Sequence, residues 1–249
     1  MIVFITGASS GFGAAIAERF AQEGHSLILA ARRMDRMREL AAALNTATHL
    51  IELDVRDNNA VTQAVASLPS DFSAVDLLVN NAGLALGMEP AHKALLDDWE
   101  RMVDTNIKGL MYMTRALLPG MVDRGRGHVI NIGSTAGEWP YPGGNVYGGT
   151  KAFVRQFSLN LRADLHGTSV RVTDVEPGLC GDTEFSQVRF HGDDDKARKV
   201  YENAESLTAK DIADTVHWIA SRPEHVNVNT ISLMPVSQAH AAWAIHRKK

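Results

Sequence analysis

Short apolar runs alternate with longer amphipathic segments along the chain, and this alternation limits the fold more than any other feature. The runs lie at residues 2–6, 26–31, 49–55, 75–80, 128–134, 169–175 and 229–234. Most are apolar throughout, as in strands of a parallel sheet that is covered on both faces. Helical patterns fill the intervals at about residues 13–22, 34–44, 58–68, 96–121, 147–165 and 208–221, the last opening with the capping-box sequence TAKD.

This order of elements predicts an α/β protein with right-handed crossovers. We expect a single-domain Rossmann fold, in which helices cover both faces of a doubly wound parallel sheet of about seven strands. The 249 residues are enough for one domain of this kind, spanning 1–249, and show no repeat or linker. Residues 180–206 have little periodicity and are predicted to form a mobile substrate flap, in which the DDD run at 193–195 is a solvated loop.

The composition argues against several classes of partner. A net charge of −4 and a pI near 6.2 provide no basic surface for nucleic acid or anionic membranes. The only cysteine is Cys180, which fits a reducing compartment, and we expect the cytoplasm. The apolar opening MIVFI is too short for a signal-peptide core or a membrane span, and ten histidines form no ligand cluster that would predict a metal.

The first apolar run ends in TGASSGFG, residues 6–13, directly before a predicted helix. Glycines at this spacing allow a tight turn and let a pyrophosphate approach the backbone at the helix N-terminus. A glycine-rich turn also serves as a purely structural connection, but the flanking strand and helix favour dinucleotide binding.

Cofactor choice is predicted from the end of the second run, AARR. An acidic residue here would bind a free ribose 2′-hydroxyl, whereas arginine accommodates a 2′-phosphate. The chain has Arg32 and Arg33 and no acid before Asp35. The alternative is a solvated start of the next helix, and the position favours NADP over NAD.

Two further strand ends carry polar or small residues. Asp54 closes the third run and is a candidate for the adenine amino group, or for the cap of the next helix. The fourth run ends in NNAG, where Asn80, Ala82 and Gly83 suit close contact with a ribose and ring.

The stretch YGGTK places Tyr147 and Lys151 four residues apart, on one face of a predicted helix. An ammonium group near a phenol favours phenolate, so we expect the lysine to lower the pKa of Tyr147 from about 10. Ser134 ends the fifth strand and is placed to hold a substrate oxygen, and Asn106 to hold a polar group or water behind the lysine. Each residue has a structural alternative. Tyr147 would be a packing residue, Lys151 a solvated one and Ser134 a helix cap, while Asn106 would hydrogen-bond the backbone of a kinked helix.

Taken together, TGASSGFG, NNAG, NIGS, YGGTK and EPG resemble, in order and approximate spacing, the short-chain dehydrogenase/reductase family over essentially the full chain. The resemblance implies a catalytic tetrad of Asn106, Ser134, Tyr147 and Lys151, the last two also contacting the cofactor. It implies that the pyrophosphate lies among Gly7, Ser9, Ser10, Gly11, Phe12 and Gly13. It also implies that Pro177 and Gly178 lie against the nicotinamide and Thr183 near its carboxamide or phosphate, although Thr183 is one residue farther from PG than is usual.

A narrower resemblance rests on NNAGLALGMEPAHKA, on the segment from GSTAGEWPYPGG to LRADLHG, and on GDTEFSQVRFHGDDDKA. These are similar to bacterial NADP-dependent 3-hydroxy acid dehydrogenases, which act on L-allo-threonine, serine or 3-hydroxypropionate and reduce malonic semialdehyde. Cys180 and Asp182 depart from that pattern, which leaves their effect on substrate choice open. Phe153, Phe157 and Leu161 give the helix at 147–165 an apolar face that suits either the core or an oligomer interface. The resemblance also implies a homotetramer, in which this helix packs across a subunit boundary.

The reaction implied is reversible hydride transfer between NADP and a small 3-hydroxy acid. Substrate binding is expected at Ser134 and Tyr147, and at Arg189 on the flap, whose guanidinium would clamp the carboxylate, unless it is a surface group paired with DDD. Alternatives are a 3-oxoacyl carrier-protein reductase or another short-chain carbonyl reductase, a nucleotide-sugar epimerase, and a non-catalytic NADP-sensing regulator. The first usually ends in a VDGG-like segment, absent here, and the second needs a larger substrate domain.

Overall fold

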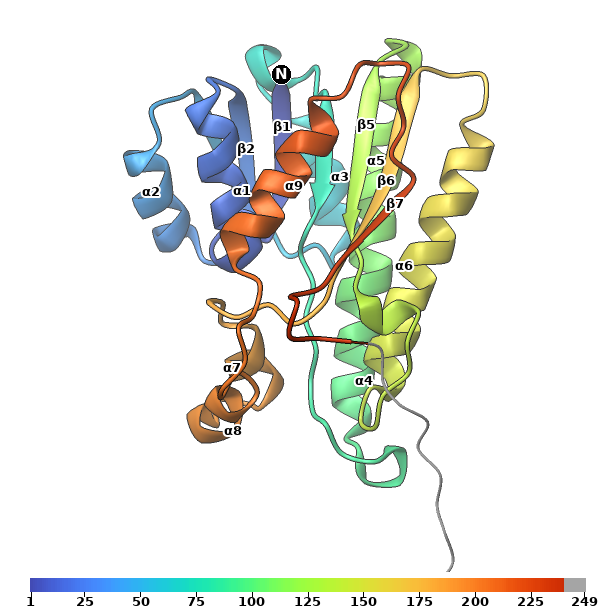
Figure 1. Ribbon diagram of the computed structural model, residues 1–249. Helices are drawn as coiled ribbons and strands as arrows, with labels where there is room; N and C mark the ends of the chain where they lie inside the picture. Colours follow the sequence, from blue (N-terminus) through green and yellow to red (C-terminus); the bar gives the residue numbers. More distant parts are fainter. Residues whose placement is uncertain (240–249) are drawn as a thin grey trace, which may run out of the picture.

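The computed structural model describes residues 1–239. Residues 240–249, which the sequence analysis included in its single domain, lie outside the described part. Within it the seven strands are β1 (Ile2–Thr6), β2 (Ser26–Ala31), β3 (Thr48–Glu52), β4 (Leu77–Asn80), β5 (Gly127–Ile132), β6 (Val170–Pro177) and β7 (Thr230–Leu233). They form one parallel sheet in the order β3-β2-β1-β4-β5-β6-β7, which confirms the predicted fold class (Figure 1).

The helices of residues 1–239 are α1 (Gly11–Gln22), α2 (Met34–Ala43), α3 (Asn58–Ala66), α4 (Leu96–Val103), α5 (Leu110–Asp123), α6 (Asn145–Asp164), α7 (Phe185–Arg189), α8 (Asp194–Lys199) and α9 (Ala209–Ala220). Short 3₁₀ turns lie at Ser70–Phe72, Ala91–Lys93 and Thr135–Gly137. The TAKD sequence forms the expected capping box, with Thr208 and Asp211 bonding reciprocally at the start of α9.

Two apolar cores lie on opposite faces of the sheet. On one face Val3 and Ile5 of β1 pack with Ile16 and Phe20 of α1 and with α9. On the other face Phe4 packs with side chains of α3, α5 and α6. Successive β1 side chains thus enter different cores, which explains why this strand is apolar at every position rather than at every second one.

The predicted helix at 96–121 is interrupted. Residues Asp104–Gly109 form a π-helical turn between α4 and α5. Gly109 lies against Val55, where an added Cβ would come within 2.6 Å of a Val55 methyl group. The wider turn lets the helix backbone approach the sheet at this point, and such turns are frequent at functional sites.

The predicted flap, 180–206, contains regular structure that its weak periodicity did not reveal. Helices α7 and α8 form a small lobe beyond the carboxyl ends of the strands (Figure 1). The DDD run is not a loop: Asp193 caps α8 and Asp194 and Asp195 form its first turn. Carboxylates are favourable there because they face the unpaired amides of the helix N-terminus, an effect that periodicity cannot register.

Candidate active site

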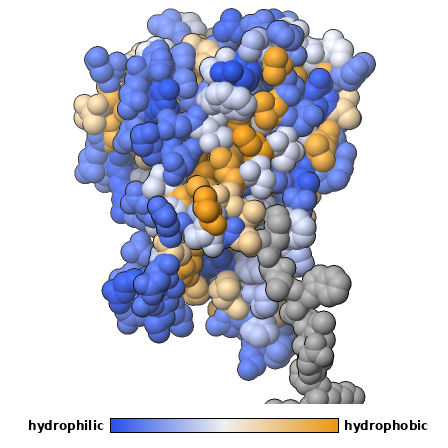
Figure 2. Space-filling model, in the orientation of Figure 1, coloured by the Kyte–Doolittle hydropathy of each residue, from blue (hydrophilic) through white to orange (hydrophobic). Residues whose placement is uncertain are grey.

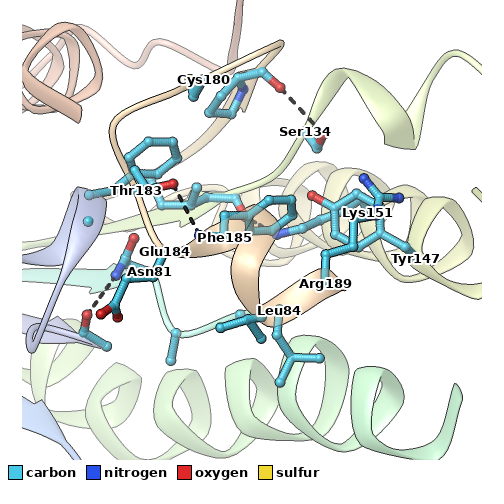
Figure 3. A pocket seen from close by; sticks show the side chains of 18 of the residues that line it. Asn81, Leu84, Ser134, Tyr147, Lys151, Cys180, Thr183, Glu184, Phe185 and Arg189 are labelled. Atoms are coloured by element: carbon cyan, nitrogen blue, oxygen red, sulfur yellow. Dashed lines mark hydrogen bonds between the residues drawn. The ribbon is translucent and has the colours of Figure 1, made fainter. Parts of the chain in front are cut away.

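A cavity of about 660 Å³ opens at the carboxyl edge of the sheet, where the chain order reverses between β1 and β4. Its walls come from the segments that follow β1, β2, β4, β5 and β6, and from the flap (Figure 3). In open α/β sheets this crevice is the usual ligand site. The catalytic and cofactor candidates of the sequence analysis lie in its wall, except Gly13, Asn80 and Asn106.

The glycine turn after β1 forms one wall. Gly7 has a φ of +66°, and a Cβ there would lie 3.0 Å from the Cα of Ala82. Ser9, Ser10, Gly11 and Phe12 line the cavity at the start of α1. Gly13 serves packing instead, because a Cβ there would collide with the Gly7 carbonyl oxygen. The exposed backbone at the start of a twelve-residue helix fits a pyrophosphate.

A cluster of cations and hydroxyls lies beside this turn. The Arg33 guanidinium donates to the Ser9 hydroxyl at 3.2 Å, to Ser10 at 2.7 Å, and to the Glu184 carboxylate of the flap at 2.8 Å. Arg36 also binds Glu184, and the two arginines lower the pKa of Glu184 to about 2. Arg32 lines the cavity alongside. Two guanidinium groups converge on one carboxylate, with two serine hydroxyls beside them, and the same groups fit a 2′-phosphate.

Asp54 and Asn80 are placed differently from expectation. Asp54 lines the cavity but forms an ion pair with Arg56, and the cap of α3 is Asp57. Asn80 lies outside the cavity wall, and its buried amide donates to Thr114 and Asn131. The next residue, Asn81, lines the cavity and ties β4 to the turn after β1, by donating to the Thr6 carbonyl. The register of one residue decides which side chain faces the cavity.

Tyr147, Lys151 and Ser134 converge in the cavity (Figure 3). The Lys151 Nζ lies 5.9 Å from the Tyr147 ring centroid and donates to the Ile132 carbonyl at 2.7 Å. Ser134 receives a hydrogen bond from the Ala136 amide and donates to the Pro177 carbonyl at 3.4 Å. Pro177 and Gly178 form the adjoining wall. A phenol, an ammonium group and a hydroxyl in one crevice form an acid–base site.

The expectation that Lys151 lowers the pKa of Tyr147 is wrong for this arrangement. Burial raises the pKa of Tyr147 to about 12, and hydrogen bonding by Ser134 and the charge of Arg189 act in the opposite direction. Burial also lowers the pKa of Lys151 to about 8. Removal from water penalises both charged forms, and Lys151 directs its ammonium group to a carbonyl rather than to the phenol.

Asn106 lies in the π turn, 3% exposed, behind the cavity. Its side chain accepts from the Leu84 amide and donates to the Leu84 carbonyl and to Thr150. It therefore joins the π turn, the segment after β4, and α6. The structure shows this bracing role, and the water-holding role stays a prediction.

The flap closes over the catalytic groups from the opposite side. Arg189 donates to the Tyr141 hydroxyl at 2.5 Å and to the Gly87 carbonyl at 3.3 Å, and its Cζ lies 5.4 Å from the Tyr147 ring centroid. Phe185 packs edge-on against Tyr147. Arg189 forms no ion pair with DDD or any other carboxylate within residues 1–239; Asp193 pairs with Lys196 and Asp195 with Arg198.

Three contacts hold the flap at separate points. Glu184 binds the arginine cluster, the backbone of Arg189 accepts a hydrogen bond from Gly87, and His191 contacts the nearly buried Asp98 of α4 at 3.0 Å. Thr183 lies against Gly11, 3.4 Å from where a Cβ would stand. The flap therefore touches the regions assigned to the 2′-phosphate, the pyrophosphate and the reacting centre.

Sequence reasoning missed Glu184, Tyr141, Phe185 and Asn81. Glu184 was visible only as an acid among flap residues, and nothing local connects it to arginines some 150 positions earlier. Tyr141 lies in the turn-rich run WPYPGGN. An aromatic residue between two prolines indicates a loop of fixed conformation, and this pattern could have identified it.

The two residues that depart from the family pattern differ in placement. Cys180 lines the cavity but is buried, and burial raises the pKa of its thiol to about 12, so it remains a neutral wall residue. Asp182 is exposed, with a φ of +55°.

Among residues 1–239, no group of three or more His, Cys, Asp or Glu side chains is arranged to hold a metal ion. None of the helices in that range has the length and apolar character needed to cross a membrane.

Comparison with known proteins identifies the family of the chain. The family model described as short chain dehydrogenase matches residues 1–194. The chain belongs to the short-chain dehydrogenase family. It is 61% identical over 248 residues to the NADP-dependent 3-hydroxy acid dehydrogenase of Shigella flexneri, covering 100% of both chains. It is 51% identical over 246 residues to the serine 3-dehydrogenase of Rhizobium radiobacter, covering 99% of this chain and 98% of the relative.

Solved structures extend the likeness to the whole fold. The closed form of serine dehydrogenase complexed with NADP+ superimposes with a TM-score of 0.98 at 60% identity, covering 100% of both chains. A serine dehydrogenase from Escherichia coli gives a TM-score of 0.86 at 55% identity, covering 96% of this chain and 100% of the other.

Proposed function

We propose that this protein is an NADP-dependent dehydrogenase of small 3-hydroxy acids, of the type of serine, L-allo-threonine and 3-hydroxypropionate, and that it also reduces the corresponding 3-oxo acids, such as malonic semialdehyde. The observation that carries the substrate class is Arg189, a cation without a carboxylate partner in residues 1–239, beside Tyr147. The names of the relatives from Shigella flexneri and Rhizobium radiobacter support the same assignment.

Bound NADP supplies the nicotinamide that accepts or returns the hydride. Arg32 and Arg33 are the proposed contacts of its 2′-phosphate. The glycine turn, which includes Gly11, is the proposed contact of its pyrophosphate. Asp54, Ala82, Gly83, Pro177, Gly178 and Thr183 line the rest of its proposed site. Asn80 supports this wall from behind, through its buried hydrogen bonds.

The protein's own groups manage the proton and the substrate. In oxidation, ionised Tyr147 takes the proton of the substrate hydroxyl, and in reduction the neutral phenol returns it. Ser134 hydrogen-bonds the reacting oxygen, and Lys151 provides positive charge near the phenol. Because burial favours the neutral phenol, the resting site is prepared to act as an acid, and oxidation is expected to speed up with alkaline pH.

Arg189 provides the substrate carboxylate with a charged partner. In a 3-hydroxy acid the carboxylate lies about two carbons from the carbinol carbon, so its cation must stand a few ångströms beyond the acid–base group. Arg189 meets this requirement, since its guanidinium lies over the Tyr147 ring while Tyr141 and Gly87 hold its orientation. A held guanidinium recognises a carboxylate through charge-assisted hydrogen bonds.

The test is formation of NADPH, followed by absorbance, with NADP and a panel of serine, L-allo-threonine, 3-hydroxypropionate and an unrelated secondary alcohol. Tyr147→Phe should lower kcat by about 10²- to 10⁴-fold with little change in the unfolding temperature. Tyr112→Phe, on α5 outside the cavity wall, is the matched control and should retain turnover. Near-normal turnover in the Tyr147 variant would contradict the assignment.

The rival functions are separated by the same assay. A 3-oxoacyl carrier-protein reductase would prefer the acyl carrier-protein substrate over free acids, and a regulator would bind NADP without turnover. Arg189 favours the free acid, because a thioester has no carboxylate at this position.

We further propose a homotetramer in the cytoplasm. The last strand of the described sheet, β7, has a free edge, and apolar surface runs across this face of the molecule near it (Figure 2). Trp218 on α9 and Val236 after β7 are exposed, as are Met111 on α5 and Leu159 on α6. Apolar edges of this kind are commonly covered by another copy. The test is the mass in solution, which for a tetramer is four times 27.1 kDa.

A further inference from the structure

Two carboxyl side chains are buried together beneath the catalytic helix, and the mechanism above does not use them. Asp174 and Glu176 lie on β6 and are 0% and 1% exposed. Residues two apart on a strand face the same side of a sheet, so both face α6. Both Asp174 oxygens and one Glu176 oxygen lack a hydrogen-bond donor among the described residues.

Buried carboxylates without donors are costly to charge. Burial raises the pKa of both side chains above its ordinary range; the charge of Glu176 raises the pKa of Asp174 further, to about 7, whereas hydrogen bonding with Asp174 lowers the pKa of Glu176. The pair therefore retains one proton up to about pH 7, and above that pH Asp174 carries a negative charge.

The cations that face the pair are both on α6. Lys151 and Arg155 are four residues apart, on one face of the helix. The attraction of Asp174 raises the pKa of Lys151, opposing its burial, and Arg155 Nε lies 3.5 Å from Glu176. The Asp174 carboxyl covers Gly133, the residue directly after the carbonyl that Lys151 binds, and it leaves no room for a Cβ there.

We propose that Asp174 of this pair is the counter-charge of Lys151: its buried carboxylate, beside Gly133, keeps the lysine an ammonium ion. Asp174 is a positioning residue that acts through Lys151, and it does not touch substrate. This role deepens the proposed function, since an uncharged amine would no longer provide positive charge near the phenol.

Other titratable groups also lie around these residues. Glu138, on the turn before α6, pairs with Arg155 and raises the pKa of Glu176. On the cavity side the titratable neighbours of Tyr147 are Tyr141, Arg189 and Cys180. Among described residues the segment of β7 that pairs with β6, Thr230–Leu233, has no titratable side chain.

The experiment measures the charge of Lys151 directly. Protein labelled with ¹³C at lysine Cε is titrated by NMR, and the Lys151 signal is assigned by its loss in Lys151→Met. Asp174→Asn should move the Lys151 midpoint down by about one pH unit, because the nearer negative charge is gone. Glu176→Gln should move it much less, because Asp174 is already ionised at the pH where Lys151 titrates, and Glu176 faces Arg155 instead. Asp164→Asn, at the exposed end of the same helix about 20 Å away, should leave it unchanged.

A drop in Asp174→Asn that the near-isosteric Glu176→Gln does not share is not expected of a merely structural pair. An equal shift in both variants, or in neither, would overturn the proposal. If Asp174→Asn does not fold, Glu176→Gln still decides, since a drop of a full pH unit in that variant contradicts the proposal. The measurement needs no turnover, so it can fail while the dehydrogenase assignment stands, and the reverse also holds.

Discussion

Arg189→Met is the substitution that most directly examines the substrate class. Methionine retains much of the apolar stem over the Tyr147 ring but removes the charge and the donors to Tyr141 and Gly87. Arg189 has no carboxylate partner in residues 1–239, so no protein ion pair is lost with it. The main change is therefore the loss of a cation that the substrate carboxylate would meet.

The magnitude follows from that contact. A hydrogen bond to a charged group contributes about 1.5–3 kcal/mol, which corresponds to about 10- to 150-fold in kcat/KM. A second effect is common to all substrates: Arg189 lowers the pKa of Tyr147, so its removal raises that pKa and moves the rise of oxidation with pH to higher pH. Acids should show both effects and neutral substrates only the second.

The assay compares 3-hydroxypropionate with its amide, 3-hydroxypropionamide, which has the same size and no charge. Rates are taken across the pH range, so that the Tyr147 effect is separated from the loss of binding. Arg198→Met is the matched control, because this flap arginine pairs with Asp195 on α8 outside the main cavity. An equal loss for the acid and the amide, or no loss for the acid, would refute the clamp.

Three further predictions concern the cofactor and the buried acid pair. Replacing Arg32 and Arg33 by Gln removes contacts to the 2′-phosphate worth about 1.5–3 kcal/mol each, so fluorescence titration should show much weaker NADPH binding and little change for NADH. Equal weakening of both cofactors would show that the arginines stabilise the fold instead. Glu184→Gln removes the carboxylate that neutralises Arg33, so NADPH should bind about two- to fivefold more tightly while NADH binding is unchanged. Weaker binding of both cofactors would show that the contact of Glu184 with Arg33 contributes more by holding the flap than it costs by neutralising the arginine. Burial raises the pKa of Asp174 from 3.8 to about 7, so the folded state holds a proton that the unfolded chain releases, and stability should fall as pH rises from about 4 to about 7. Asp174→Asn should remove up to about 1.4 kcal/mol per pH unit of that slope in urea unfolding, and an unchanged slope would contradict this.

The sequence by itself determined the layered fold and the groups that the chemistry needs. Runs that are apolar at every position require cover on both faces, as Val3, Phe4 and Ile5 show by entering two different cores. The YGGTK spacing fixes Tyr147 and Lys151 on one helix face, because i and i+4 positions always meet there. These relations are local, and a local pattern is sufficient to predict them.

Only the tertiary structure decided the electrostatics and the long-range contacts. Whether Tyr147 favours phenol or phenolate depends on burial, which outweighs the hydrogen bonding by Ser134 and the charge of Arg189. One residue of register placed Asn81 rather than Asn80 in the cavity wall. Glu184 meets Arg33 from 151 positions away, and the β6 carboxyl pair meets Lys151 from another layer. Desolvation and contacts between distant segments exist only once the chain has closed around them, so they leave no periodic trace in the sequence.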